Sequence, residues 1–285
     1  MEINSKCYTF QRMEVVEGLF DSSVDATYVI TLESNGRYER VKEQLQKYHP
    51  TRILYIATNK GYKRCKKDLH KEAPAYDLTD AFINVFIHAN QQGYKNILVL
   101  EDDFIFSERV FDPKILSTVN QFVSARTDTN FIYLLGCLPQ LMIPYDSNHY
   151  IPVQSGGTHA VIYSRQFRDQ SIIEYNNSVI EDWDIYCKVT SERYTYHEPI
   201  AYQLFPVTEN SLKWFESEFL VRFAHYYIKM FRLDIDVEPG YSIFYAASKI
   251  LYYVLIAALL GVIGFAGYML HSRLGKKFLH LRGRS

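Results

Sequence analysis

Residues 96–103, NILVLEDD, join a short apolar run to three consecutive acids, Glu101, Asp102 and Asp103. The apolar run predicts a buried strand, which delivers the acids to its carboxyl end. Open α/β sheets bind ligands outside the carboxyl ends of their strands, and carboxylate oxygens are hard ligands for divalent cations. The stretch therefore predicts a site for a cation and a phosphate. A solvated turn is the alternative interpretation of the acids alone.

Strands and helices alternate around this stretch. We expect further strands at residues 27–32, 52–58, 131–135 and 159–163, and helices at 37–48, 77–93 and from Pro113 onward. The alternation predicts an α/β fold with a largely parallel sheet that helices cover on both faces. The sequence contains no G-x-G-x-x-G or G-x-x-x-x-G-K-[ST] motif, which excludes the standard dinucleotide and P-loop sites.

Charge and cysteine usage narrow the class of protein. The 285 residues carry a formal net charge of −1, which supplies no basic field for nucleic acid, so no nucleic-acid partner is expected. Cys7, Cys65, Cys137 and Cys187 lie far apart without a Cys-x-x-Cys motif. Neither a zinc site nor a disulfide framework is indicated, and we expect free thiols in a reducing compartment.

Residues 250–270 form an apolar segment without a charged side chain. As a helix, these about 21 residues reach roughly 31 Å, enough to cross the hydrocarbon core of a bilayer. Tyr252, Tyr253 and Tyr268 lie near the ends, as interfacial aromatic residues do. The segment predicts a single-pass membrane anchor, and a buried helix of a soluble core is the alternative.

The orientation of this anchor is open to two arguments. Residues 271–285 contain lysines and arginines but no acid, which by the positive-inside rule places the tail in the cytoplasm and the large domain outside or in a lumen. The N-terminus shows no apolar signal segment, and together with the thiols this favours a tail-anchored protein with a cytosolic catalytic domain, our expectation here. A glycan on the sequon at Asn176 would show the opposite orientation.

Residues 216–236 predict an amphipathic helix, because apolar side chains recur there at three- and four-residue steps. The apolar positions are Phe219, Leu220, Phe223, Tyr227, Met230 and Phe231. This face either lies on a membrane surface beside the anchor or docks on the domain's own core. The chain then divides into an N-terminal extension (1–25), a catalytic domain (26–215), this helix with a linker (216–240), and the anchor with its basic tail (241–285).

Five motifs, in order, carry a resemblance to a known family. They are YVITLESNGRYERV (28–41), NILVLEDDFIF (96–106), SGGTHAVIYSRQ (155–166), EDWDIY (181–186) and HEPIAYQLFPVTENSL (197–212). In this order they resemble the family 25 glycosyltransferases, the group of lipooligosaccharide and collagen hydroxylysine galactosyltransferases, over about residues 26–213. The resemblance implies a GT-A fold, a nucleotide-sugar donor that is usually UDP-linked, often Mn²⁺, and inversion at the anomeric carbon. The family's first strand usually ends in Asn-Leu-Asp followed by arginines near a proline, whereas this chain has Thr31-Leu32-Glu33 with Arg37 and Arg40.

The acidic motif is the expected cation site. Transfer of a sugar from a nucleotide diphosphate develops negative charge on the leaving phosphate, which a bound cation neutralises. We expect Asp103 to bind Mn²⁺ or Mg²⁺ directly, and Glu101 to act as a second ligand or to contact the ribose or sugar. Asp102 is a further donor-binding candidate. His197 is a candidate late ligand, with a structural histidine as the alternative.

The remaining candidates surround the acceptor and the donor. Asp182 or Asp184, with Asp182 preferred, is the expected general base for the acceptor hydroxyl, and helix capping is the alternative for one of them. Trp183 between them either stacks on a sugar or packs in the core. The expected donor contacts are Thr31, Glu33, Arg40, Gly157, Thr158 and His159.

Together with the resemblance, these patterns predict a membrane-anchored, metal-dependent glycosyltransferase, and the resemblance implies that it inverts the anomeric carbon. The expected reaction moves a hexose from a nucleotide-diphosphate sugar to a hydroxyl of a glycan, lipid or protein. Two alternatives stand beside it: a catalytically inactive GT-A domain that serves as a membrane-tethered scaffold, and metal-dependent phosphoester hydrolysis at the same acids.

Overall fold

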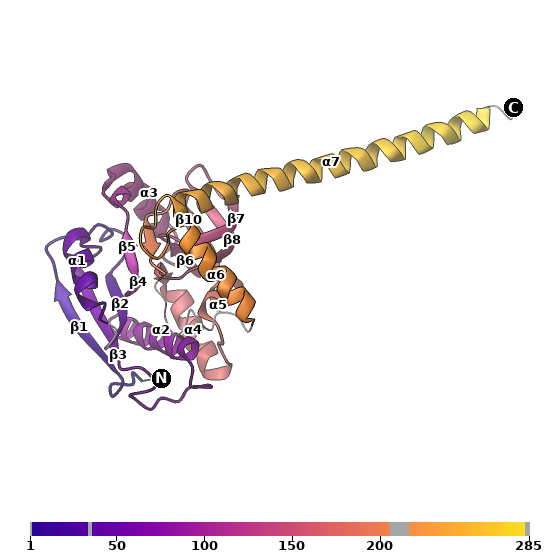
Figure 1. The fold of residues 1–285 in the computed structure, drawn as a ribbon. Helices are drawn as coiled ribbons and strands as arrows, with labels where there is room; N and C mark the ends of the chain where they lie inside the picture. The colour runs from indigo at the N-terminus through magenta and orange to yellow at the C-terminus, as the bar shows by residue number, and fades with distance from the viewer. Residues whose placement is uncertain (1, 34–35, 206–216, 283–285) are drawn as a thin grey trace.

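The structure is a computed structural model that describes residues 2–33, 36–205 and 217–282. Figure 1 labels the helices and strands within these ranges. Four parts of the sequence interpretation lie outside the described residues. They are residues 34–35 of the first motif, residues 206–216 with the end of the last motif and the first residue of the expected amphipathic helix, the side chain of Leu220, and the side chains of the basic tail from residue 272 onward.

Within the described residues, a nine-stranded sheet forms the centre of the domain. In spatial order its strands are β1 (Tyr8–Glu14), β3 (Ile53–Asn59), β2 (Ala26–Leu32), β4 (Asn96–Glu101), β9 (Ala160–Ser164), β6 (Phe131–Leu134), β10 (Glu192–Tyr196), β8 (His149–Gly156) and β7 (Leu138–Pro144). A small second sheet pairs β5 (Phe104–Phe106) with β11 (Ala201–Gln203).

The sheet is mixed rather than largely parallel. β2 is parallel to β3 and β4, and β10 is parallel to β6, but the other neighbouring strands are antiparallel. Apart from β1, which lies antiparallel to β3 at the far edge, the antiparallel pairs follow from the β7–β8 hairpin. At its turn the Asp146 carboxylate accepts the N–H groups of Asn148 and His149. This turn reverses the chain, and β8 continues in the same direction into β9, which therefore runs antiparallel between β4 and β6.

Helices cover both faces of the sheet, which confirms the predicted α/β class. The helices are α1 (Tyr38–Tyr48), α2 (Pro74–Gln91), the 3-10 helix η1 (Glu108–Phe111), α3 (Pro113–Ser124), α4 (Arg165–Asn177), α5 (Trp183–Thr190), α6 (Glu218–Met230) and α7 (Gly240–Arg282). Side chains of β2 alternate between the two faces. Tyr28 and Ile30 pack in the apolar cluster with α2, α4 and α5, whereas Val29 packs in the cluster with α1 and α3.

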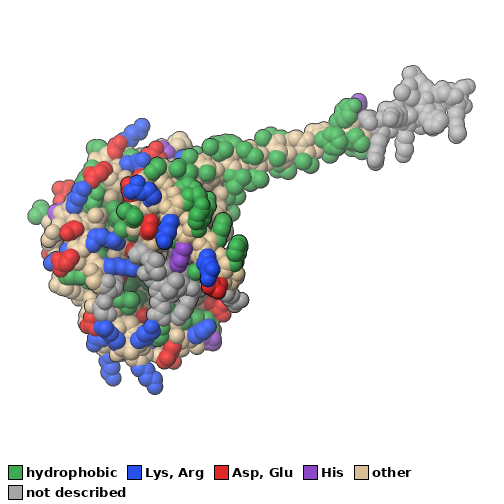
Figure 2. All heavy atoms as spheres, in the orientation of Figure 1, with side chains coloured by type: hydrophobic (Ala, Val, Ile, Leu, Met, Phe, Trp, Pro, Cys, Tyr) green, Lys and Arg blue, Asp and Glu red, His purple; other side chains and the backbone are tan. Residues whose placement is uncertain are grey.

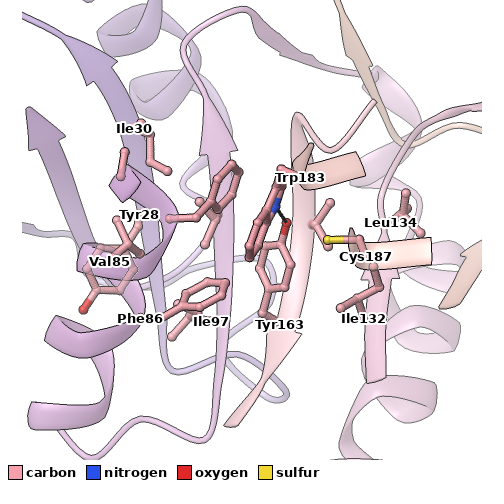
Figure 3. Packing of buried hydrophobic residues seen from close by; sticks show 14 of the residues in the cluster. Tyr28, Ile30, Val85, Phe86, Ile97, Ile132, Leu134, Tyr163, Trp183 and Cys187 are labelled. Carbon is pink, nitrogen blue, oxygen red and sulfur yellow. Dashed lines mark hydrogen bonds between the residues drawn. The ribbon is translucent and has the colours of Figure 1, made fainter. Parts of the chain in front are cut away.

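Trp183 belongs to the core. Figure 3 shows it beside Tyr163 and Phe86, under the sheet face that α2 covers. Its ring stacks on Phe82 with centroids 4.7 Å apart, and its indole N–H donates to the Tyr163 hydroxyl at 3.1 Å. The core interpretation of this tryptophan is therefore confirmed, and its ring is not available to stack on a sugar.

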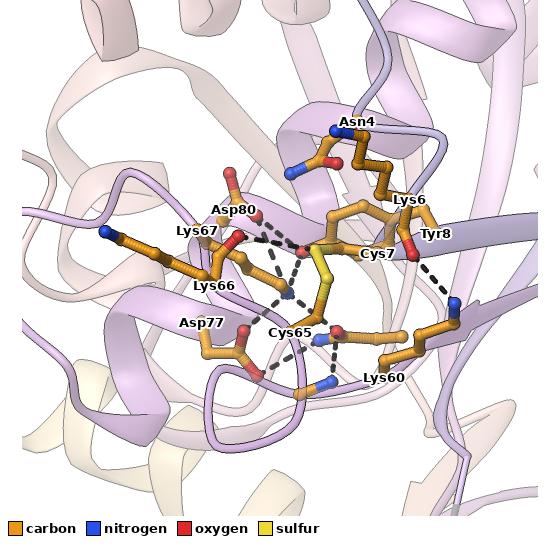
Figure 4. The surroundings of a disulfide bond; sticks show 12 residues. Asn4, Lys6, Cys7, Tyr8, Lys60, Cys65, Lys66, Lys67, Asp77 and Asp80 are labelled. Atoms are coloured by element: carbon orange, nitrogen blue, oxygen red, sulfur yellow. Dashed lines mark hydrogen bonds and ion pairs between the residues drawn. A yellow bond between two sulfur atoms is a disulfide. The ribbon is translucent and has the colours of Figure 1, made fainter.

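The N-terminal residues are part of the domain through β1 and a disulfide. Cys7 and Cys65 are bonded, with Cα atoms 5.6 Å apart, which corrects the expectation of free thiols. Sequence spacing could not show this pair, because 58 residues separate the cysteines and the fold brings them together through β1 pairing with β3. Cys137 and Cys187 are free and buried. Figure 4 shows the Lys67 ammonium beside the bridge, where it is paired with Asp77 at 2.6 Å.

The C-terminal helix α7 begins inside the core and ends far from it (Figure 1). Tyr241 and Tyr245 are fully buried, so the first turns of the expected anchor segment are part of the packed domain. Within the 32 residues Gly240–His271, an 18-residue window has a mean hydropathy of 2.3, and the segment is long and apolar enough to cross a membrane. From Ile250 onward the apolar side chains are exposed (Figure 2), unlike those of a buried core helix.

Candidate active site

The acidic motif lies at the point where the strand order reverses. The chain passes from β2 through α1 to β3 on one side, and then through α2 to β4 on the other side of β2. Because α1 and α2 lie on opposite faces, the segments that follow β2 and β4 meet at the carboxyl edge, where open sheets of this kind bind ligands. The meeting is direct: Arg37 donates to the Asp102 carboxylate at 2.6 Å.

Two arginines at the start of α1, Arg37 and Arg40, lie beside the acids. Besides Asp102, Arg37 lies 3.7 Å from the Asp103 carboxylate. Arg40 reaches the carbonyl of Asp102 at 3.4 Å, while its buried Nε has no hydrogen-bond partner among the described residues. The site therefore combines guanidinium groups, which suit phosphate oxygens, with carboxylates, which suit a cation.

Asp103 is a buried carboxylate that is only half satisfied. Its Oδ2 accepts from the Gln203 side-chain amide at 3.3 Å, but its Oδ1 has no hydrogen-bond partner among the described residues. Burial, and then the neighbouring Asp102, raise the pKa of Asp103 to about 6, against the opposing effect of Arg37. A buried acceptor without a partner is destabilising unless something else binds it.

A hydrogen-bonded chain joins Glu101 to the start of α5. The Thr158 hydroxyl lies 2.8 Å from Asp184 Oδ1 and 3.3 Å from Glu101 Oε1. The Gly157 N–H donates to Asp184 Oδ2 at 2.9 Å. Gly157 has φ +89°, and a Cβ there would meet His159 Nδ1 at 3.2 Å, so this tight turn requires glycine.

Glu101, Asp103 and Asp184 at this edge have raised pKa values. Burial, and next the charge of Asp103, raise the pKa of Glu101. Burial also raises the pKa of Asp184, although its bonds to Gly157 and Thr158 oppose the shift. Carboxylates that are expensive to ionise gain most from a bound cation, which is the electrostatic signature expected of a cation site.

The donor set fits a shared rather than an all-protein metal site. No group of three His, Cys, Asp or Glu side chains within residues 2–33, 36–205 and 217–271 is arranged to hold a metal ion. A cation that bridges a diphosphate needs only one or two carboxylates, with phosphate and water as the other ligands. Asp103, with its unpartnered buried oxygen, is the side chain that fits this smaller set.

Asp182 and Asp184 occupy different environments. Asp182 is exposed and caps α5, its carboxylate accepting the Ile185 N–H at 2.8 Å. Asp184 is half-buried, and both of its oxygens accept hydrogen bonds from the segment before β9. Capping is therefore a role of Asp182, and Asp184 holds Thr158 in place.

Other predicted contacts are spread along the edge. Thr31 is buried at the end of β2, where its hydroxyl has no hydrogen-bond partner within the described part of the chain, and Glu33 is exposed beyond it. The His159 ring is fully buried, and burial lowers its pKa to about 3, so it is neutral at physiological pH. His197 is placed elsewhere: its ring packs on Tyr196, and its backbone binds Asn148 and Lys249.

Sequence reasoning did not assign Arg37 and Gln203 to the site. Both lie within motifs of the resemblance, but neither carries a local signal of its own. Arg37 precedes α1, and Gln203 ends β11, the strand that pairs with β5 directly after the acids. Only that pairing brings the glutamine to Asp103.

Comparisons with known proteins do not assign an activity to this chain. No family model and no curated protein matches the sequence. Among solved structures, the STIV protein A197 is similar at TM-score 0.39 and 12% identity, over 64% of this chain and 85% of that chain. A glycosyltransferase involved in glycosylation of the major capsid of PBCV-1 follows at TM-score 0.31 and 9% identity, over 53% and 66%. A nucleoside-diphosphate-sugar pyrophosphorylase from Vibrio cholerae RC9 is similar at 0.30 and 14%, over 64% and 80%. At these TM-scores none of the likenesses assigns an activity.

Proposed function

We propose that the chain is a metal-dependent glycosyltransferase that moves a hexose from a nucleotide-diphosphate sugar to a hydroxyl group. The observation that carries the proposal is the carboxyl edge of β2 and β4. There the buried Asp103 with its unpartnered oxygen lies beside Arg37 and Arg40. The resemblance to family 25 glycosyltransferases supports the same reaction class.

The donor diphosphate is the group that this edge suits. In the proposed complex Asp103 holds Mn²⁺ or Mg²⁺, and Glu101 lies behind it as a second ligand or a sugar contact. The cation supplies neutralisation of charge on the departing phosphate. Arg40 uses its unpartnered Nε for a phosphate oxygen, and Thr31 offers its buried hydroxyl to the nucleoside.

Asp182 is the proposed general base, and Asp184 positions it. Because Asp184 is bonded to Gly157 and Thr158, the start of α5 is held at the acidic edge. Asp182, two residues earlier, is exposed and keeps one carboxylate oxygen beyond its capping bond. That oxygen takes the proton of the acceptor hydroxyl as the new glycosidic bond forms.

A donor screen on the full chain tests this function. The chain should be kept whole, since Tyr241 and Tyr245 are buried in the core. We expect one nucleotide sugar to be hydrolysed or transferred only with Mn²⁺ or Mg²⁺, and Asp103→Ala to abolish this. Asp128→Ala, at an exposed position, is the matched control. Phosphate release without a sugar requirement would instead indicate a phosphoesterase, and no donor binding at all would indicate a scaffold.

The proposed setting is a membrane, with α7 as the single span. The disulfide removes the thiol argument for a cytosolic domain, and the basic tail after the span favours a domain on the non-cytoplasmic side. Protease added to sealed cells or vesicles of known orientation tests this placement. Cleavage of the domain from the cytoplasmic side would overturn it.

A further inference from the structure

Helix α6 presents a continuous apolar face to the outside of the domain. The face consists of Phe219, Phe223, Tyr226, Tyr227 and Met230, whose exposed fractions run from 37% to 74%. Their spacing places them on one stripe of the helix. We call this set the α6 stripe.

The opposite side of α6 packs against the domain. Val221 is buried, and Ile228 and Phe231 pack against the core. The rings of Tyr227 and Phe231 contact Phe244 at the start of α7, with centroids 5.9 and 5.2 Å apart. The domain therefore holds α6 in place through one face, and docking on the core leaves the α6 stripe exposed apart from the contact of Tyr227, at its border, with Phe244.

The α6 stripe lies next to the point where α7 leaves the domain. Phe244 precedes Ile250, where the exposed apolar span begins, by six residues, about 9 Å along a helix. Figure 1 shows α6 running across the direction of α7, on the side of the domain from which α7 extends. Figure 2 shows apolar side chains over this region, with cationic side chains among them.

Cationic residues border the α6 stripe on one side. Arg222 and Lys229 are exposed and lie on the helix side away from the packed residues. Arg222 is bonded to Glu218 at 2.7 Å, so Lys229 is the more independent charge. An apolar face flanked by cations matches a bilayer interface, where acyl chains lie below anionic phosphate groups.

We propose that the α6 stripe is a second membrane contact, which lies in the headgroup and acyl boundary of the bilayer that α7 spans. The proposal rests on the proposed anchoring by α7, since the continuity of the stripe with that span selects lipid as its occupant. Helix α6 then lies in the plane of the membrane, and the α6 stripe faces the acyl chains. The second contact fixes how the domain is rotated on its anchor.

Fluorophores attached to single cysteines in the full chain, reconstituted in phospholipid vesicles, test the proposal. Cys137 and Cys187 are buried and Cys7 is bonded to Cys65, so an introduced cysteine is the accessible thiol among the described residues. The labelled variants are Phe223→Cys and Tyr226→Cys in the α6 stripe, and Leu259→Cys in the span. Val16→Cys is the water-exposed control, 94% exposed and next to β1, at the sheet edge opposite the β7 strand that α7 contacts.

Two quenchers separate the outcomes. We expect phospholipids brominated on the acyl chain to quench the labels at 223, 226 and 259, because an interfacial helix lies about 5–10 Å into the boundary. We expect aqueous iodide to quench only the label at 16. Labels at 223 and 226 that respond to iodide as position 16 does would overturn the proposal. Shielding of both from both quenchers would show a protein occupant, such as a second copy, and would overturn it too. A label at 259 that lipid does not quench would refute the anchoring itself, which distinguishes that failure from failure of the α6 contact alone.

Discussion

Asp103 is held where its charge is poorly solvated, and this has a consequence for stability. The shift of its pKa from 3.8 to about 6 corresponds to on the order of 3 kcal/mol that ionisation costs the folded state. This free-energy penalty is absent at pH values below the pKa of Asp103 in the unfolded chain, and it is complete at pH values above the pKa of Asp103 in the folded protein. Without a bound cation, the contribution of Asp103 to native stability therefore falls as the pH rises from about 4 to 6.

The Asp103→Asn variant should separate stability from function. Without added metal, we expect it to be more stable than the native protein at pH 8 and equal to it at pH 4, because an amide cannot ionise. Thermal melting at the two pH values measures this difference. Equal melting temperatures at pH 8 would show that Asp103 is not strained by its charge, and retained metal-dependent donor binding would exclude it as the ligand.

Variants of Asp182 can separate its proposed role as general base from its role as helix cap. A cap needs only a side-chain oxygen that accepts a backbone N–H, whereas a base needs a carboxylate that takes up a proton. Asn is as good a helix cap as Asp, so Asp182→Asn should keep the stability of the protein while lowering kcat by about 10²–10⁴-fold. Asp182→Ala should lose activity and also about 1 kcal/mol of stability through the lost cap. Kinetics and urea unfolding of both variants decide the point, and an active Asp182→Asn would leave capping as the role of this residue.

Some of the site is readable from sequence and some is not. Glu101, Asp102 and Asp103 follow a short, β-rich apolar run between a predicted helix and the acids, so their place at the sheet edge was predictable. Their partners Arg37 and Gln203 come from distant segments of the chain. Strand order brings Arg37 to Asp102, and β5–β11 pairing brings Gln203 to Asp103. Such contacts depend on register between distant segments, which local pattern does not specify.

At the scale of elements, the strongly apolar strands and the helices α1 and α2 were predicted to within a few residues, whereas α7 extends well beyond both ends of the expected span at 250–270. The helix α4 and the strands β1, β5, β7, β8, β10 and β11 were not predicted. The β7 and β8 strands contain prolines, Pro139 and Pro152, and β8 has exposed positions on both faces, so neither shows clean alternation. α2 begins at Pro74, three residues before the expected start, because proline is favoured in the first helical turn. The predicted strand β9 runs antiparallel to β4 and β6, and the missed strands β1, β7 and β8 add the other antiparallel pairs of the sheet.

The Cys7–Cys65 bridge joins β1 to the segment before α2, next to the buried Lys67–Asp77 pair. Closing a loop of this length restricts the unfolded chain, and we expect Cys7→Ser with Cys65→Ser to lower the free energy of unfolding by about 2–4 kcal/mol. Urea unfolding with and without a reductant measures the effect. Reductant should destabilise the native protein and leave the double variant unchanged; equal sensitivity of both would argue against the bridge.

At the scale of the whole molecule, domain and anchor are not separable at the start of α7. A chain that ends at residue 240 lacks the buried Tyr241 and Tyr245, and the loss of one such aromatic side chain already costs about 3–5 kcal/mol. A chain that ends after Lys249 keeps both tyrosines and the bond from Lys249 to the His197 carbonyl. We expect the longer chain to unfold cooperatively and the shorter one to be largely unfolded, as circular dichroism in urea would show. Equal stability of the two would place the boundary at residue 240.

The unbroken course of α7 sets a geometric limit on the proposed reaction. The same helix that is buried as Tyr241 and Tyr245 continues through the apolar span, with no hinge between them. In the proposed membrane setting, the transfer site is therefore kept at a constant height above the lipid. A hydroxyl on a membrane-bound acceptor would be modified when it stands at that height, and chemically identical hydroxyls closer to or further from the bilayer would be passed over.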